Sequence, residues 1–412
     1  MSLRLPLVII LGATGSGKTK LSLELAKKFA GEIISADSMQ IYKGLDIITA
    51  KATTDERKVA PHHMIDELHP DQPFSVIDFR NKSLQIIEDL LLKNALPIVV
   101  GGTNYYIESL LWKILVEDWK EATYTTKLIK DCELSSAELH KMLLERDPIR
   151  AKRLHPNDKR KILRSLEILE LKGRKHSDIL LEQQTSAGGS ALGGGLRFTN
   201  SVVLWITCDQ TVLDERLDTR VDLMLKQGLV EELLDFHKKY NEKRVQQDAD
   251  YTKGIFQSIG FKEFHQYLML APDDRSTENG ERLFKSAVDD LKRVTRRYAK
   301  KQKRWIINRF LDKNSDRQVP PVYELNATDL SKWEECVTDK AVSIVECFLN
   351  NSICQYAPKP QQETKAMPNS RAEQYFCNDC NRIFIGNHQW ESHMKSHKHK
   401  RTLQRKRKNN AQ

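Results

Sequence analysis

The chain has 412 residues, a formal net charge of +10 at pH 7 and seven cysteines. This length is enough for two or three domains with a large core, and no apolar run reaches the roughly eighteen residues that cross a membrane. An odd number of mostly scattered cysteines argues against a disulfide framework and favours a reducing compartment. The excess positive charge favours a polyanionic partner such as a nucleic acid, although it could equally serve solubility.

The first predicted strand, over residues 5–11, is a continuous apolar run of the kind that a parallel sheet buries on both faces. It leads into residues 12–19, which match the phosphate-loop pattern G-x-x-x-x-G-K-[ST], and apolar residues at helical spacing follow. Glycines in this setting let backbone N–H groups converge on phosphate oxygens beside a positively polarised helix N-terminus. The predicted phosphate-binding residues are Gly12, Ala13, Thr14, Gly15, Ser16, Gly17, Lys18 and Thr19.

The loop predicts that the ligand carries phosphate groups, but it does not identify the phosphorylated compound. Lys18 supplies a full positive charge, and Thr19 can hold a Mg²⁺ ion that bridges phosphates. NTPases and kinases are the commonest owners of such a loop. A second predicted strand, over residues 32–35, ends close to Asp37 and so places a carboxylate beside the phosphate site. Asp37 could bind a metal ion, as in such enzymes, or it could only cap a turn or helix.

Two further apolar runs, residues 95–100 and 201–207, predict strands that helical segments separate from the first two. Strands alternating with helices build βαβ units. The sequence therefore predicts an α/β fold with a P-loop NTPase-like parallel sheet flanked by helices, in a catalytic core formed by residues 1–118 and 196–312.

Residues 119–195 interrupt this core and differ from it in composition. They are charged and helical in pattern, with Leu139, Leu143 and Leu144 expected on one face, and they end in the glycine-rich loop 187–195. The segment lies between two sheet strands, which predicts an inserted helical subdomain.

Beyond the fourth strand the pattern predicts helices over residues 213–240 and 283–310. A C-terminal extension over 313–354 follows. Residues 355–374 are polar and contain three prolines, which is typical of a disordered linker.

Residues 375–400 carry the spacing of a C₂H₂ zinc finger, with Phe384 and Trp390 between the ligand pairs to supply a small core. Two thiolates and two imidazoles fill a tetrahedral Zn²⁺ site, so this metal is structural. His397 offers an alternative, shorter spacing. The predicted zinc ligands are Cys377, Cys380, His393 and His399.

Several of these motifs together resemble the tRNA dimethylallyltransferase family, also called tRNA isopentenyltransferases, and the C-terminal C₂H₂ module resembles its eukaryotic branch. The resemblance covers roughly residues 5–310. The matching segments are residues 12–19, 37–40, 61–63, 101–106, 155–158, 164–167, 220–222 and 257–263.

The resemblance implies a reaction. A dimethylallyl group passes from dimethylallyl pyrophosphate to N6 of the adenosine adjacent (3′) to the anticodon, tRNA position 37, which gives N6-isopentenyladenosine and pyrophosphate. The loop then cradles pyrophosphate, and Asp37 is the base that accepts the N6 proton. Lys18, Thr19 through Mg²⁺, and Arg220 would stabilise the departing pyrophosphate. Arg220 could equally be an exposed helix charge.

The target adenine must leave its stack to react. The Gln40 amide could bond a base edge, whereas Tyr105 and Tyr106 could stack on a base or belong to the core. The basic stretch 158–164 could contact phosphates or only form a solvated face. Residues 117–136 match little of the bacterial pattern, so no contact is carried over there. The tRNA contacts that the resemblance implies are Asp37, Ser38, Met39, Gln40, Thr103, Arg160, Lys161 and Arg164.

The implied partners are a tRNA anticodon stem-loop and dimethylallyl pyrophosphate, with no membrane, and the implied metals are Mg²⁺ at the pyrophosphate and structural Zn²⁺. We expect a monomer in the cytoplasm, with the nucleus and the mitochondrion as further compartments. The basic tail, residues 401–412, could contact RNA, act as a nuclear localisation signal or aid solubility.

Two rival functions remain to be weighed. One is a kinase that uses ATP at the same loop, and the motifs at residues 37–40 and 257–263 argue against it. The other is a non-catalytic RNA-binding regulator with a vestigial loop, and the intact Lys18, Thr19 and Asp37 argue against that.

Overall fold

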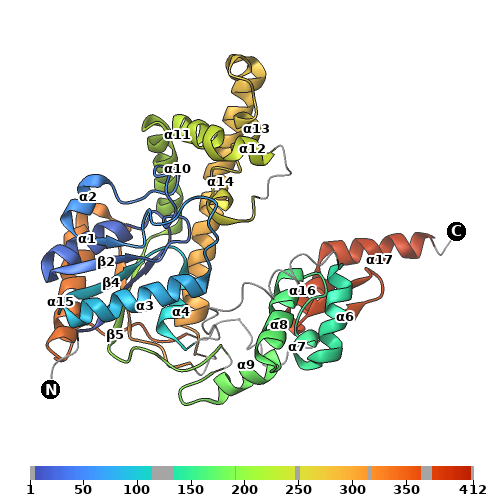
Figure 1. Cartoon of the computed structure of the whole chain (residues 1–412), viewed down its shortest axis with the longest axis horizontal. Coiled ribbons are helices and arrows are strands. Elements are labelled where there is room, and N and C mark those ends of the chain that lie inside the picture. The colour runs from blue at the N-terminus through green and yellow to red at the C-terminus, as the bar shows by residue number, and fades with distance from the viewer. Residues whose placement is uncertain are drawn as a thin grey trace. The chain divides into compact units, whose positions relative to one another are not determined.

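The computed structural model describes residues 5–113, 134–190, 192–245, 251–313, 317–362 and 374–409 (Figure 1). The chain packs as two compact units. The sheet unit is formed by Met1–Trp112, Leu196–Asp312 and Val319–Gln362, and the second unit by Lys113–Gly195, Lys313–Gln318 and Glu363–Gln412. Among the described residues, no helix is both long and apolar enough to cross a membrane.

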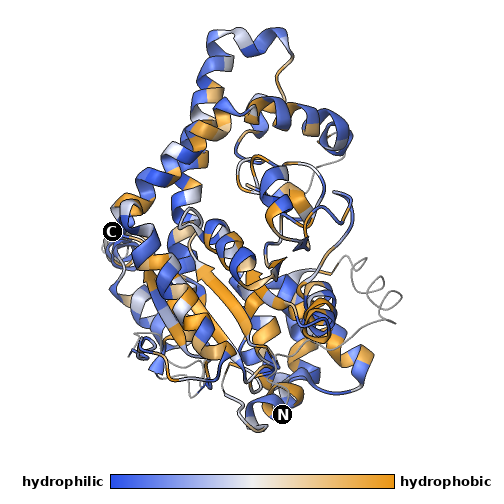
Figure 2. Cartoon of the chain, turned by 90° about the vertical axis from the view of Figure 1, so that its left-hand side faces the viewer, coloured by the Kyte–Doolittle hydropathy of each residue, from blue (hydrophilic) through white to orange (hydrophobic). Residues whose placement is uncertain are grey.

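The sheet unit is built on a six-stranded sheet in the order β3-β2-β4-β1-β5-β6, and every neighbouring pair is parallel. Its strands are largely orange, the colour of apolar residues, in Figure 2. Burial on both faces explains the continuous apolar runs of the sequence. This arrangement confirms the predicted fold class. The strands are β1 (Leu7–Gly12), β2 (Gly31–Ser35), β3 (His62–His63), β4 (Leu96–Val100), β5 (Ser201–Thr207) and β6 (Val322–Asn326).

Helices cover the sheet because their apolar faces pack on its strands (Figure 1). On one face, Val8 and Ile10 of β1 share a buried cluster with Leu21 of α1 and Ile344 of α15. The α-helices of the sheet unit are α1 (Lys18–Phe29), α2 (Thr54–Val59), α3 (Val76–Leu92), α4 (Asn104–Leu111), α10 (Gln210–Lys226), α11 (Leu229–Phe236), α12 (Glu242–Val245), α13 (His265–Leu268), α14 (Glu278–Phe310) and α15 (Asp339–Leu349).

Two helix boundaries differ from the sequence expectation. The helical stretch expected over residues 213–240 begins at Gln210 and is divided into α10 and α11, because Gly228 adopts a left-handed backbone with φ of 94° between them. The helix expected over residues 283–310 begins earlier, at Glu278, where the Thr277 side chain accepts a hydrogen bond from the Gly280 N–H.

From Val319 onward, the C-terminal extension belongs to the sheet unit. Its strand β6 pairs with β5, and α15 joins the buried cluster under the sheet. Part of the expected linker packs here too, since the Lys359 N–H donates to the Val322 carbonyl at 2.6 Å and the Gln362 N–H donates to that of Leu311 at 2.6 Å. The structure thus differs from an extension that stops at residue 354. Residues 363–373 lie outside the described part of the chain.

The second unit contains the predicted inserted helices, which enclose a small core of their own. Leu139 and Leu143 of α6 are buried in it, together with Ile162 of α8. Leu144 was expected on the same face but is 42% exposed. The helices are α6 (Ser136–Arg146), α7 (Pro148–Lys152), α8 (Lys159–Lys172) and α9 (His176–Thr185).

The zinc-finger module, residues 374–409, has the ββα order of a small metal-binding domain. Its elements are β7 (Gln374–Cys377), β8 (Arg382–Ile385), α16 (Asn387–Lys395) and α17 (His397–Asn409). The two strands are antiparallel. The predicted basic tail continues the module as a helix up to Asn409.

Candidate active site and metal site

The phosphate loop lies between the end of β1 at Gly12 and the start of α1 at Lys18. Gly15 and Gly17 have φ of 78° and 96°, a left-handed backbone that favours glycine. A Cβ added to Gly12 would lie 2.5 Å from the Ser16 hydroxyl, so this position also leaves no room for a side chain. The loop therefore has the compact form that turns backbone N–H groups toward an anion.

Lys18 extends along this loop, and its ammonium donates to the Ala13 carbonyl at 2.8 Å. Burial and the nearby Arg220 charge lower the Lys18 pKa to about 8, while the Asp37 carboxylate acts in the opposite direction. An anion bound in the loop would oppose both effects, because its negative charge favours the protonated form of Lys18.

Arg220 comes from α10 and reaches the loop, where its guanidinium donates to the Thr14 hydroxyl at 3.1 Å. Burial lowers the Arg220 pKa, and Asp37 partly offsets this effect. The side chain is therefore not the exposed helix charge that the sequence left open.

Asp37 follows β2, and its carboxylate accepts a hydrogen bond from the Met39 N–H at 2.9 Å. Burial raises the Asp37 pKa, although the hydrogen bonds from the backbone of Met39 and Gln40 and the Lys18 and Arg220 charges oppose the shift. A carboxylate with a raised pKa is a stronger base than an ordinary aspartate.

Two adjoining cavities share Asp37 and Arg220 in their linings. The first, of about 350 Å³, is lined by the phosphate loop, including Lys18 and Thr19, and by Gln40 and His62. The second, of about 220 Å³, has a mixed wall whose apolar part includes Met39, Leu217 and Met224. The residues that line both cavities are Thr14, Asp37, Thr49, Arg220 and Tyr298. The acid, the arginine and the loop thus stand where the two cavities meet.

The Gln40 side chain acts inside the protein. Its amide oxygen accepts from the Ser35 hydroxyl at 2.8 Å, and its amide nitrogen donates to the carbonyls of Thr49 and Ala50, both at 3.1 Å. The expectation that this amide bonds a base edge is not what the structure shows, because both ends are already paired. Gln40 instead holds the segment at Thr49 and Ala50 in the cavity wall.

Ser38 and Thr103 lie together beside Asp37. The Ser38 N–H donates to the Thr103 hydroxyl at 3.0 Å, and that hydroxyl donates to the Ser38 hydroxyl at 3.2 Å. Ser38 and Met39 both line the second cavity. The two segments that the sequence singled out, far apart along the chain, thus meet at the carboxyl ends of β2 and β4.

The basic stretch 295–305 matches the family pattern too, and sequence reasoning let it reach tRNA or line the catalytic channel but assigned no individual role to Tyr298 and Gln302, which lie on α14. The Tyr298 hydroxyl donates to the Gly102 carbonyl at 3.2 Å, and the Gln302 amide nitrogen donates to the same carbonyl at 2.9 Å. The Gln302 amide oxygen accepts from the Thr14 N–H at 2.8 Å. Their spacing of four residues on a helical face was the available signal. Tyr106 is a core residue, stacked on Phe79 with ring centroids 4.2 Å apart.

The predicted basic contacts Arg160, Lys161 and Arg164 all lie on α8 in the second unit. Arg160 and Lys161 are exposed, and Arg164 is half-buried. The Lys161 ammonium pairs with Asp158 at 2.7 Å. The predicted site residues are therefore divided between the two units of the chain. The segment 117–136 falls mostly outside the described residues.

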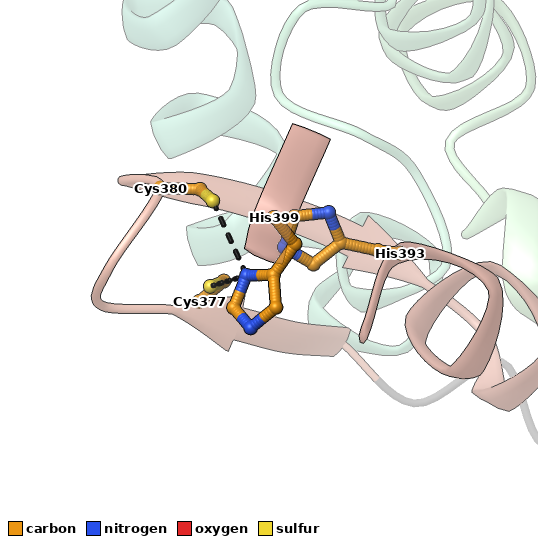
Figure 3. A group of neighbouring side chains, drawn as sticks. All are labelled: Cys377, Cys380, His393 and His399. Carbon is orange, nitrogen blue, oxygen red and sulfur yellow. Dashed lines mark hydrogen bonds between the residues drawn. The ribbon is translucent and has the colours of Figure 1, made fainter. Parts of the chain in front are cut away.

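The four predicted zinc ligands converge in the zinc-finger module (Figure 3). Their ligand atoms all lie within 4.8 Å of one another, and the His399 Nδ1 lies 3.4 Å from the Cys380 sulfur and 3.6 Å from the Cys377 sulfur. The His393 Nε2 is buried without a hydrogen-bond partner among the described residues, as a metal ligand would be. His397 is exposed, so His399 completes the set.

The small core of the module forms beside these ligands, as the sequence predicts. Phe384 stacks on His393 with ring centroids 4.1 Å apart, and the Trp390 ring lies 6.0 Å from Phe384 and 5.5 Å from Tyr375. The donor set and its packing fit a closed, structural Zn²⁺ site.

Known proteins resemble this chain in sequence and in structure. The tRNA dimethylallyltransferase of Homo sapiens is 48% identical over 98% of this chain and 87% of its own length. The enzyme of the same name from Schizosaccharomyces pombe is 36% identical over 97% of this chain and 95% of its own length. A crystal structure of a eukaryotic dimethylallyltransferase acting on tRNA aligns with a TM-score of 0.82 at 30% identity, over 99% of this chain and 98% of that one.

Family sequence models agree with these relatives. The model described as IPP transferase matches residues 40–309, and that described as isopentenyl transferase matches residues 5–67. The zinc-finger module matches a family described as zinc-finger double-stranded RNA-binding, over residues 374–400. With one family model covering more than half of its length and relatives similar along nearly all of it, the chain belongs to the IPP transferase family.

Proposed function

We propose that this chain transfers a dimethylallyl group from dimethylallyl pyrophosphate to N6 of the adenosine 3′ of a tRNA anticodon. The observation that supports this most directly is the meeting of two cavities at Asp37 and Arg220. A group-transfer reaction needs one space for each substrate and a base and a cation where they touch. The family membership of the chain supplies the identity of the two substrates.

The two cavities differ in a way that fits the reaction. In a direct displacement the nucleophile approaches the carbon opposite the leaving group. The pyrophosphate would lie in the first cavity on the loop, and the adenine would enter from the second, where Met39, Leu217 and Met224 offer apolar contact to a flipped base. The reacting carbon would then stand at the junction.

The step is balanced by groups already in place. The bond from N6 to the allylic carbon forms while the bond from that carbon to the pyrophosphate oxygen breaks. Asp37 takes the N6 proton, a role that its burial favours because it raises the carboxyl pKa. The positive charges of Lys18 and Arg220 stabilise the negative charge that develops on the pyrophosphate.

A Mg²⁺ ion fits the first cavity. Thr19 lines the cavity with Asp37, and the loop leaves room for phosphate oxygens. Magnesium prefers few protein oxygens together with phosphates and water, which this lining offers. Thr19 would hold the ion, and the ion would supply further charge for pyrophosphate to leave.

The second unit would bind the tRNA. Arg160 and Lys161 of α8 present exposed positive charge, and so do Lys400 and Arg401 of α17. Such side chains neutralise backbone phosphates without reading sequence. Binding by the zinc-finger module accords with the double-stranded RNA-binding description of the family that it matches.

The decisive experiment compares donors. Purified protein is incubated with unmodified tRNA and either dimethylallyl pyrophosphate or ATP, each with Mg²⁺, and the digested nucleosides are analysed by mass spectrometry. We expect N6-isopentenyladenosine with dimethylallyl pyrophosphate and no new nucleoside with ATP. A product that requires ATP, or the absence of any product with the prenyl donor, would overturn the proposal.

A further inference from the structure

We propose that Trp333, in the C-terminal extension, is a positioning residue that braces the phosphate loop from outside the substrate cavities. The tryptophan is 3% exposed and lies between two short helical turns, Leu330–Lys332 and Glu334–Thr338. It lines neither cavity, so it would act on the reaction only through the loop. The proposal rests on the proposed function in taking pyrophosphate as the ligand of that loop.

The first contact is between the indole ring and the loop backbone. A Cβ added to Gly17 would lie 2.5 Å and 2.6 Å from two carbons of the Trp333 ring. The ring therefore packs directly on Gly17, the residue before Lys18. Gly17 has φ of 96°, and glycine is the residue with the widest backbone freedom. The rigid Trp333 ring restricts the backbone of Gly17, and the conformation of Gly17 sets the direction of the neighbouring N–H groups.

The second contact fixes the ring to the helix that follows the loop. The Trp333 indole N–H lies 3.1 Å from both carboxylate oxygens of Glu24 on α1. The Thr338 hydroxyl donates to the same carboxylate at 2.8 Å. The Lys20 ammonium lies 4.6 Å from the Trp333 ring centroid and 3.9 Å from Glu24. The extension thus holds both the loop and the first two turns of α1.

A third contact ties the same extension to α10, which carries Arg220. The Arg216 guanidinium donates to the carbonyls of Ala327 and Thr328 at 2.8 Å and 2.7 Å. Arg216 is one helical turn before Arg220. Leu217 of the same helix packs on Gly15, because a Cβ there would lie 2.7 Å from its Cδ2. The strand β6 and the turn after it therefore connect the groups that would surround the pyrophosphate.

Such a brace would matter because hydrogen bonds depend steeply on geometry. Backbone donors must lie about 2.7–3.1 Å from the developing oxyanion, and a loop that is held in this shape binds without first losing freedom. Loss of the brace would weaken pyrophosphate binding while the tRNA-binding surfaces stay unchanged.

The test measures pyrophosphate affinity directly. Binding of inorganic pyrophosphate with Mg²⁺ is measured by calorimetry for the full chain, for Trp333→Leu and for Ile344→Ala. Ile344 is a matched control, since it is fully buried on α15 of the same extension. At a temperature well below melting, we expect Trp333→Leu to weaken pyrophosphate binding and raise the KM for the prenyl donor by roughly tenfold. Ile344→Ala should lower the melting temperature with neither change, and the KM for tRNA should stay constant in both.

A gentler variant covers the case in which Trp333→Leu does not fold. Trp333→Phe keeps an aromatic ring beside Gly17 but removes the reporter indole. We expect pyrophosphate to change the tryptophan fluorescence of the unmodified chain and of a Trp390→Phe control, and the change to become smaller in Trp333→Phe, which keeps the other five tryptophans.

The outcomes separate the brace from the function. If the unmodified chain does not bind pyrophosphate, the proposed function is wrong. A parent that binds, together with a Trp333→Leu variant of unchanged affinity or a Trp333→Phe variant of unchanged fluorescence response, sinks only the brace.

Discussion

At the scale of single residues, the candidate active site combines three half-buried charged groups, Lys18, Arg220 and Asp37. Burial lowers the pKa of both Lys18 and Arg220, the Arg220 charge lowers the Lys18 pKa further, and the Asp37 carboxylate raises both values. The same two cations oppose the rise that burial causes in the Asp37 pKa. The protonation of each group thus depends on its own burial and on at least one of the other two charges.

The first residue-scale prediction concerns the proposed base. Asp37→Asn keeps the size of the side chain and removes its ability to accept a proton, so turnover should fall by roughly 10²- to 10⁴-fold. Binding of tRNA should stay near normal, because the change removes no phosphate contact. Single-turnover rates and a tRNA filter-binding assay measure the two effects. The exposed Asp71→Asn serves as control, and near-normal turnover of the Asp37 variant would refute the assignment.

The second residue-scale prediction concerns pH. The Lys18 pKa is lowered to about 8, so the free enzyme loses this positive charge as the pH rises through that value. The kcat/KM for the donor should therefore decline above about pH 8, since it reports the free enzyme. In Lys18→Arg the guanidinium stays charged, and the descending limb should move to higher pH even if the maximal rate is lower. Identical limbs in the two proteins would contradict the role of Lys18.

At the scale of elements, the long helix α14 acts as a strut for the loops at the carboxyl ends of the strands. Gln302 is 3% exposed and bonds both the Thr14 N–H and the Gly102 carbonyl, while Tyr298 bonds Gly102 from one turn before. One helix thus connects the phosphate loop to the loop after β4. This connection explains why a polar residue is buried on an otherwise apolar face.

The element-scale prediction tests that connection. Gln302→Leu leaves the Thr14 N–H without its partner and removes one of the two donors to the Gly102 carbonyl, which keeps the Tyr298 hydroxyl. An orphaned buried donor costs about 1–3 kcal/mol. We expect a lower free energy of unfolding in urea and a several-fold higher KM for the donor. Lys301→Met, on the exposed side of the same helix, is the control and should change neither. A destabilised variant with an unchanged donor KM would limit Gln302 to a structural role.

At the scale of the whole molecule, the two cavities lie in one unit of the chain and the residues proposed to bind tRNA lie in the other. Both cavities are lined entirely by residues of the sheet unit. The zinc-finger module and the basic helix α8 belong to the second unit. Because residues up to Gln362 pack on the sheet unit, a truncation after Gln362 removes the module and leaves the packed extension intact.

The whole-molecule prediction uses this boundary. A chain that ends at Gln362 should bind tRNA more weakly, and its affinity should depend less steeply on salt, because fewer phosphate contacts release fewer counterions. The rate of the chemical step at saturating tRNA should be retained. Cys380→Ser in the full chain, which removes one zinc ligand, should have the same direction of effect. An unaltered salt slope would remove the module from the RNA interface.

The sequence by itself determined the features that consecutive residues specify. The phosphate loop, the zinc ligands and the buried parallel strands depend on short-range spacing, backbone freedom and runs of apolar residues. In contrast, only the fold could decide whether Arg220 lies at the site or is exposed, and whether Tyr106 stacks on a base or belongs to the core. Arg220 has the same pattern as an exposed helix charge, and only the packing of α10 brings it to Thr14.

Only the tertiary structure decided which distant residues complete the site. Gln302 reaches Thr14 across 288 positions, and Trp333 reaches Glu24 across 309. It also decided that the Gln40 amide is occupied within the protein and that the helical stretch 213–240 divides at Gly228. The reason is physical: local patterns fix which faces are apolar, but the burial of those faces against one another fixes which polar groups they carry into contact.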